Sequence, residues 1–164
     1  MTRDWIRKIA DAERLRDDVQ LRGNEAAARK ADLVRLHGRR LLDELRATLG
    51  RDIDEFRLEF AGDRAREIVF EDVRPEGGFT VRKPQYPIAS LDVAPDLSAA
   101  SVTCRYRFTP TNGLPPREDR VEFRFTGDDA DALRIRHVGT GQIFTNADAL
   151  SEYLLGPVFT GRPR

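Results

Sequence analysis

The sequence predicts an α+β fold: a long N-terminal helix or helical hairpin, an antiparallel meander sheet of about six to eight strands, and a short C-terminal helix. Between Thr2 and Leu49 there is no proline, and apolar residues recur every three or four positions, which is the period of a helix. After Arg51 the apolar period falls to two, and Gly, Pro, Asn and Asp punctuate the chain, as in short strands joined by turns. No connection is long and helical enough for parallel pairing, so an antiparallel sheet is expected.

The first helix is expected to begin at Thr2, whose hydroxyl can cap the free amides of the first turn. The opposite face of this helix carries charges of both signs, which is typical of a solvated helix surface. Its apolar stripe consists of Trp5, Ile6, Ile9, Ala12, Val19, Ala27, Ala31, Val34, Leu41, Leu45 and Leu49.

The weak point of this helix is Gly23-Asn24, because glycine in a helix costs about 1 kcal/mol relative to alanine and Asn24 can cap a second helix. Two structures are therefore open, a helical hairpin and one continuous helix. The alanine-rich run over 25–31 favours the continuous or kinked helix, which at about 45 residues extends ~70 Å. Such a helix overhangs the sheet, so its first half needs a partner chain. The expected interface residues are Trp5, Ile9, Val19, Ala27, Ala31 and Val34.

Small residues along the helix permit close approach of a second helix, or else pack under the sheet; they are Gly23, Ala27, Ala31 and Gly38. The sequence favours neither alternative. Self-association through the helix is therefore a hypothesis that the solution mass decides.

Strands are predicted where apolar and polar residues alternate, beginning with Phe56, Leu58 and Phe60. Loops are predicted at the proline-containing segments 83–87 and 109–116, and turns at 76–78 and 138–141. A final helix over 145–157 opens on a capping residue and is expected to stop at Gly156-Pro157. The other strands are predicted at 68–73, 79–83, 88–93, 100–108, 121–126, 132–138 and 142–144.

Composition bounds the molecule. With 164 residues, the helical segment 1–50 and the sheet segment 51–164 are expected to form one folding unit. The net charge is zero, so no overall field attracts nucleic acid or a membrane surface. Cys104 is the only cysteine, which excludes an internal disulfide. The N-terminus has no signal-like apolar segment, so a cytoplasmic protein without membrane partners is expected.

Few residues point to catalysis. His37 and His137 lie in no metal-binding or catalytic spacing, and Cys104 falls on the predicted core face, where a thiol is unreactive. The sequence has no glycine-rich phosphate loop. The acidic residues Asp128, Asp129 and Asp131 suit a solvated turn better than a calcium loop. We therefore expect no catalytic residue, cofactor or metal.

One charged cluster exceeds this background. Like charges opposite one another destabilise a sheet, so either an anion or neighbouring carboxylates are expected to compensate them. Neighbouring aromatic residues fall on the other face, which argues against nucleic-acid bases stacking there. The sheet face opposite the core is predicted to carry Glu122 and six arginines, Arg105, Arg107, Arg120, Arg124, Arg134 and Arg136.

Three functions follow from these patterns. The leading one is a non-enzymatic module that binds itself or another protein through the long helix. The second is binding of an anion or of a nucleic-acid backbone by the arginine-rich face, with nucleic acid the less favoured partner. The third is a small-ligand protein or enzyme with a pocket between sheet and helices, lined by Tyr106, His137 and arginines.

Overall fold

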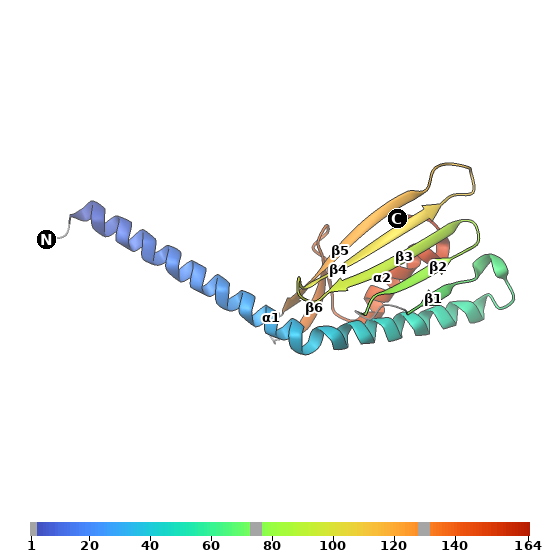
Figure 1. Cartoon of the computed structure of the whole chain (residues 1–164), viewed down its shortest axis with the longest axis horizontal. Coiled ribbons are helices and arrows are strands. Elements are labelled where there is room, and N and C mark those ends of the chain that lie inside the picture. Colours follow the sequence, from blue (N-terminus) through green and yellow to red (C-terminus); the bar gives the residue numbers. More distant parts are fainter. Residues whose placement is uncertain (1–2, 73–76, 128–131) are drawn as a thin grey trace.

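The structure, a computed structural model, describes residues 3–72, 77–127 and 132–164. It confirms the predicted α+β class: one long helix, a seven-stranded antiparallel sheet and a short C-terminal helix (Figure 1). The predicted cap at Thr2 and the acidic turn at 128–131 lie outside the described residues. The elements are α1 (Asp4–Glu59), a 3-10 turn η1 (Arg64–Arg66), β1 (Val69–Glu71), β2 (Phe79–Lys83), β3 (Ile88–Asp96), β4 (Ser101–Thr109), β5 (Arg117–Gly127), β6 (Leu133–His137), β7 (Ile143–Phe144) and α2 (Ala147–Thr160).

The seven strands form a simple meander in which each strand pairs antiparallel with the next along the chain. The predicted proline-containing loops join β2 to β3 and β4 to β5, where a missing amide costs no ladder hydrogen bond. The connection between β1 and β2 includes Gly77 at φ +87°, a conformation that glycine adopts without strain. β5 begins at Arg117, four residues before the predicted start at Val121, because its polar first residues still pair with β4.

Helix α1 is continuous through Gly23-Asn24, so the hairpin does not form. The alanine-rich segment after the glycine favours helix on both sides of it, and exposed ion pairs such as Arg14–Asp11 at 3.0 Å add support. The first half of the helix extends away from the sheet, and the ribbon bends where it reaches the strands (Figure 1).

The strand predicted at residues 56–60 is wrong, because α1 continues through this segment to Glu59. Ile53, Phe56 and Phe60 follow helical spacing, and the Phe56 ring lies 5.0 Å from that of Phe60. Phe56 also stacks on Phe159 of α2, with ring centroids 4.1 Å apart. Leu58 is 77% exposed, so the apparent alternation with Phe56 does not define a buried face.

Helix α2 opens as predicted, with the Asn146 side chain accepting from the Ala149 amide at 2.8 Å. The predicted stop at Gly156-Pro157 is wrong, because the helix continues to Thr160 with Pro157 buried inside it. Burial of the last turn against the sheet outweighs the hydrogen bond that proline cannot make. The helix ends instead at Gly161, at φ +68°, where a Cβ would clash with the carbonyl oxygen of Pro87.

One hydrophobic core joins the helices to the sheet. Leu45, Leu49 and Ile53 of α1 are at most 1% exposed, and Leu154 of α2 is fully buried. Tyr106 of β4 reaches α2, where its hydroxyl donates to the Leu154 carbonyl at 2.7 Å. Both helices thus cover the same face of the sheet, and the side chains of the other face point away from them.

Candidate functional site

The first half of α1 stands outside the core. Residues 4–32, here called the arm, are exposed except for the half-buried Ala10 and Lys30, and burial of the helix begins at Leu33. No other described element lies beside the arm (Figure 1). It nevertheless carries large apolar side chains that are 41–65% exposed, namely Trp5, Ile6, Ile9, Leu15, Val19 and Leu21.

The residues predicted to form an interface divide between two environments. Trp5, Ile9, Val19, Ala27 and Ala31 all lie on the exposed arm. The sixth, Val34, is only 3% exposed and belongs to the core. Of the small residues expected to allow close packing, Gly38 packs under the sheet, since a Cβ there would lie 3.0 Å from Leu97 Cδ2.

Sequence reasoning omitted Leu15 and Leu21 from the interface because they lie off the main apolar stripe. Both are large apolar residues on a helix face that otherwise carries charged side chains, and this feature could have identified them. Leu15 is 65% exposed and Leu21 is 57% exposed. The arm therefore presents apolar groups on more than one side.

The arm carries balanced charges. Residues 4–32 contain seven acidic and seven basic side chains. Ion pairs three residues apart, such as Arg16–Glu13 at 3.1 Å, join them along the helix. Exposed pairs of this kind contribute only a few tenths of a kcal/mol each, so they do not replace the packing that the arm lacks.

The second candidate is the outer face of the sheet. The β ladder places Arg105 directly opposite Arg120 on the neighbouring strand, and Arg124 directly opposite Arg136. Glu122 lies on the same face of β5, between Arg120 and Arg124. The structure thus brings the predicted arginines together on strands β4, β5 and β6.

The six arginines differ in their partners. Arg124 pairs with Glu122 at 3.3 Å, and Arg107 approaches Glu118 at 3.8 Å. Arg134 donates to the Thr145 carbonyl at 3.0 Å. The other three, Arg105, Arg120 and Arg136, make no side-chain hydrogen bond or ion pair with any residue that the structure describes.

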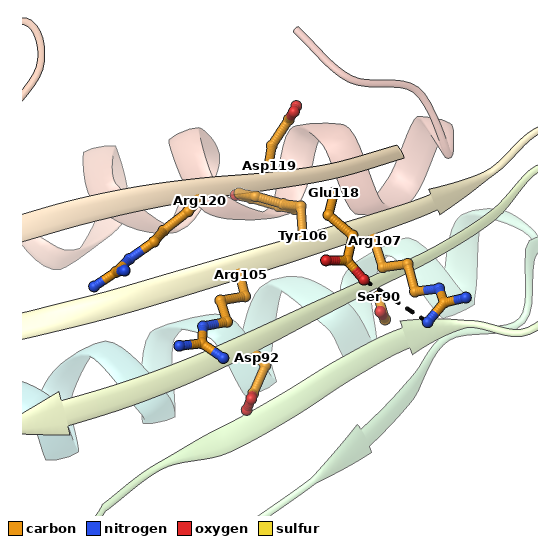
Figure 2. A pocket seen from close by; sticks show the side chains of 8 residues that line it. All are labelled: Ser90, Asp92, Arg105, Tyr106, Arg107, Glu118, Asp119 and Arg120. Carbon is orange, nitrogen blue, oxygen red and sulfur yellow. Dashed lines mark ion pairs between the residues drawn. The ribbon is translucent and has the colours of Figure 1, made fainter. Parts of the chain in front are cut away.

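A shallow hollow of about 520 Å³ lies over β3, β4 and β5 (Figure 2). Arg105 and Arg120 extend side by side from neighbouring strands, and Asp119 points the other way toward Arg117, its partner at 2.9 Å. Opposite Arg105 on β3 lies Asp92, which accepts from the Thr80 hydroxyl at 3.5 Å. The hollow is lined by Ser90, Asp92, Arg105, Tyr106, Arg107, Glu118, Asp119 and Arg120.

The aromatic rings of β4 and β5 do not reach this face, including that of Tyr106, a residue that borders the hollow. Tyr106, Phe108, Phe123 and Phe125 are each at most 3% exposed, on the side of the sheet that the helices cover. Aromatic platforms for stacked bases are therefore not provided by these four residues.

The titratable groups weighed for catalysis are separated. His37 is exposed on α1, whereas His137 is buried and its Nδ1 accepts from the Thr140 amide at 2.9 Å. Burial raises the pKa of the Cys104 thiol above its usual range, as it does for the Tyr106 hydroxyl. Within the described residues no group of three or more His, Cys, Asp or Glu could hold a metal ion.

A pocket does lie between the sheet and the helices, but the residues that line it are mostly not those that were predicted. A hollow of about 260 Å³ lies between α1, β6 and the start of α2, lined largely by aliphatic residues including Leu41 and Leu150. Neither Tyr106 nor His137 lines it. The position of this pocket therefore does not support a role for Tyr106 or His137 as a catalytic acid, base or nucleophile.

Lys83 is a buried group that sequence reasoning did not single out. Its Nζ donates to the carbonyl oxygens of Gln85 and Pro87, at 2.8 and 3.0 Å, and so holds the β2–β3 loop. Burial lowers the pKa of Lys83, and the nearby charge of Arg66 lowers it further. Lys83 lies on the core-facing side of β2, directly before a proline, and this position in the sequence could have identified it.

Comparison of the chain with protein-family models, with curated proteins and with solved structures found no match. Among the described residues, no helix is both long enough and apolar enough to cross a membrane.

Proposed function

We propose that this protein is a non-enzymatic assembly module that pairs with a second copy of itself through the arm. The observation that carries the proposal is the exposure of Trp5, Ile9 and Val19 on the arm, the part of α1 beside which no other described element lies. Large apolar groups gathered on such a projection are typical of an interaction surface.

The physics of isolated helices supports a partner. Most helical stability in proteins comes from packing of an apolar face rather than from intrinsic helix propensity. Gly23 lowers the stability of the arm further, because glycine has a poor helix propensity and its position, where a Cβ would meet nothing within 4 Å, offers no packing in return. Burial of the arm against another helix supplies the missing stabilisation.

The pattern of the arm suits a second copy. Apolar residues recur at intervals of seven, at Trp5, Ala12, Val19 and Ala26, which is the spacing of one seam position in a coiled coil. The arm has equal numbers of acidic and basic residues, so its net charge is zero and two arms do not repel each other through net charge. A coiled coil needs a second apolar position in each heptad, and here that position holds Ile9, Arg16, Gly23 and Lys30. Because only Ile9 among these is a large apolar residue, we expect a weak dimer that depends on concentration.

The test is the mass of the full chain in solution, by light scattering and sedimentation over a wide concentration range. We expect reversible doubling of the mass, with helix content rising as the dimer forms because the arm ceases to fray. A monomer at every concentration contradicts pairing with a second copy.

Matched variants assign any association to the arm. Ile9→Glu combined with Val19→Glu places charge on the seam and should abolish the dimer. Leu58→Glu makes the same chemical change at a residue of α1 that is 77% exposed outside the arm, and it should leave the dimer intact. Equal loss of association in both variants contradicts an arm-specific interface.

A further inference from the structure

The arginines at the centre of the outer sheet face carry an energetic conflict. Arg105 and Arg120 are direct cross-strand neighbours, and like charges in that relation destabilise a sheet. Neither has a hydrogen bond or ion pair with a described residue, although Asp92 stands opposite Arg105. Residues that reduce stability in this way are typical of sites whose compensation comes from a ligand.

The hollow around this pair has the groups that an anion needs. Arg105, Arg107 and Arg120 come from two neighbouring strands, and Ser90 of β3 lies beside Arg107, its cross-strand neighbour. Guanidinium groups present paired N–H donors that match the oxygens of phosphate. The volume of about 520 Å³ is that of a small-molecule site.

The surroundings limit the size of the anion. Asp92 and Glu118 line the hollow, and Glu122 separates Arg120 from Arg124 farther along β5. These carboxylates interrupt the basic track that a polymer backbone would follow. The aromatic residues of β4 and β5 are buried on the opposite face, so bases cannot stack on them.

We propose that the hollow around Arg105 and Arg120 binds the phosphate monoester group of a small molecule. The dianion lies between the two guanidiniums and relieves their repulsion. This site is separate from the arm, so it stands or falls independently of self-association.

Calorimetric titration of the full chain with inorganic phosphate, and then with a sugar phosphate, tests the site. Arg105→Gln and Arg120→Gln should each weaken binding by about tenfold, the usual effect of losing a hydrogen bond to a charged group. Arg124→Gln is the matched control: it removes the same charge from the same face of β5, outside the hollow, and should change the affinity by less than about twofold. Equal weakening by all three variants, or no binding by the wild-type chain, overturns the proposal.

The pH dependence identifies the charge state of the ligand. A phosphate monoester takes up a proton and loses its second negative charge as the pH falls through about 6, so the affinity for the sugar phosphate should fall several-fold from about pH 7.5 to about pH 5.5. Sulfate keeps two charges over this range and should bind equally at both values. The charged protein groups that face the site are Arg105, Arg107, Arg120, Asp92 and Glu118. A parallel fall for sulfate would show that these protein groups change instead, and overturns the proposal.

Two further measurements distinguish phosphate binding from a structural role of Arg105 and from binding of a nucleic-acid backbone. Arg105→Gln should leave thermal stability unchanged or raise it, and a marked loss would show that Arg105 is structural. A single-stranded oligonucleotide without terminal phosphates should bind more weakly than the sugar phosphate. Tighter binding of the oligonucleotide overturns the small-molecule proposal in favour of a backbone-binding face.

Discussion

The two halves of α1 belong to one continuous helix and differ in almost everything else. The arm, residues 4–32, is exposed, whereas the half from Leu33 to Glu59 supplies seven buried residues to the core. The packed half places leucine or isoleucine at Leu42, Leu45, Leu49 and Ile53, at spacings of three and four. In the arm the corresponding stripe is diluted by alanine, glycine and charge.

Helical periodicity does not by itself determine whether a helix is buried. Both halves satisfy the same 3.6-residue period. Only the packed half has enough large apolar groups in an unbroken stripe to hold a sheet and a second helix. The arm keeps a weaker stripe, which suits an interface that forms and dissociates.

A cavity in the packed half of α1 should destabilise the protein far more than the same kind of truncation in the arm. Ile53→Ala should lower the free energy of unfolding by about 2–5 kcal/mol, because Ile53 is fully buried between the helices and the sheet. Val19→Ala in the arm should change it by less than about 0.5 kcal/mol when the chain is monomeric. Urea unfolding at low protein concentration measures both variants. Equal losses would contradict an uncovered arm.

The two glycines of the helix provide an intermediate effect. Gly23→Ala meets nothing within 4 Å and should stabilise the arm locally by about 1 kcal/mol through helix propensity. Gly38→Ala meets Leu97 Cδ2 at 3.0 Å and Val34 Cγ1 at 3.3 Å, which offsets the same gain. Amide hydrogen exchange across α1 should therefore show greater added protection around residue 23 than around residue 38. Less added protection around residue 23 than around residue 38 would indicate that Gly23 is in a packing contact, and would contradict an uncovered arm.

The smallest effect concerns the lysines, of which Lys8 and Lys30 lie on the arm and Lys83 lies in the body. Burial lowers the pKa of Lys83 in the folded chain, so between that pKa and about 10.5 the unfolded chain binds more protons. The stability of the wild type relative to Lys83→Met should therefore rise slightly as the pH rises through this window. The neutral amine still donates to the Gln85 and Pro87 carbonyls.

Urea unfolding of both chains at several alkaline pH values measures this difference. Comparison with Lys83→Met cancels the titration of the other lysines and tyrosines. A difference that falls with rising pH would mean that the charged form of Lys83 is favoured in the folded state.

Much of the architecture was predictable because local chemistry decides it. The helix through Gly23 follows from the alanine-rich segment after it, the β4–β5 loop follows from its prolines, and a capping residue, Asn146, opens α2. The alternation of Arg105 and Arg107 with Cys104 and Tyr106 also predicted which side chains the core would bury.

The errors arose where two local signals competed. Phe56, Leu58 and Phe60 alternate like a strand, yet Phe56 also continues the stripe of Leu49 and Ile53, and packing on Phe159 selects the helix. Pro157 normally ends a helix, but its burial beneath the sheet keeps α2 intact to Thr160. In both cases the residues that provide the packing are distant in the sequence, so local patterns could not predict their contribution.

Sequence patterns alone were sufficient for the class of the fold, for the order of the elements after η1 and for the core and outer faces of β4, β5 and β6, because period and turn chemistry are local properties. The point at which burial of α1 begins depends on tertiary packing, which buries Val34 in the core and leaves Val19 in solvent. The cross-strand register likewise set Arg105 against Arg120. These outcomes depend on contacts between distant segments, whose free energies local sequence patterns do not contain.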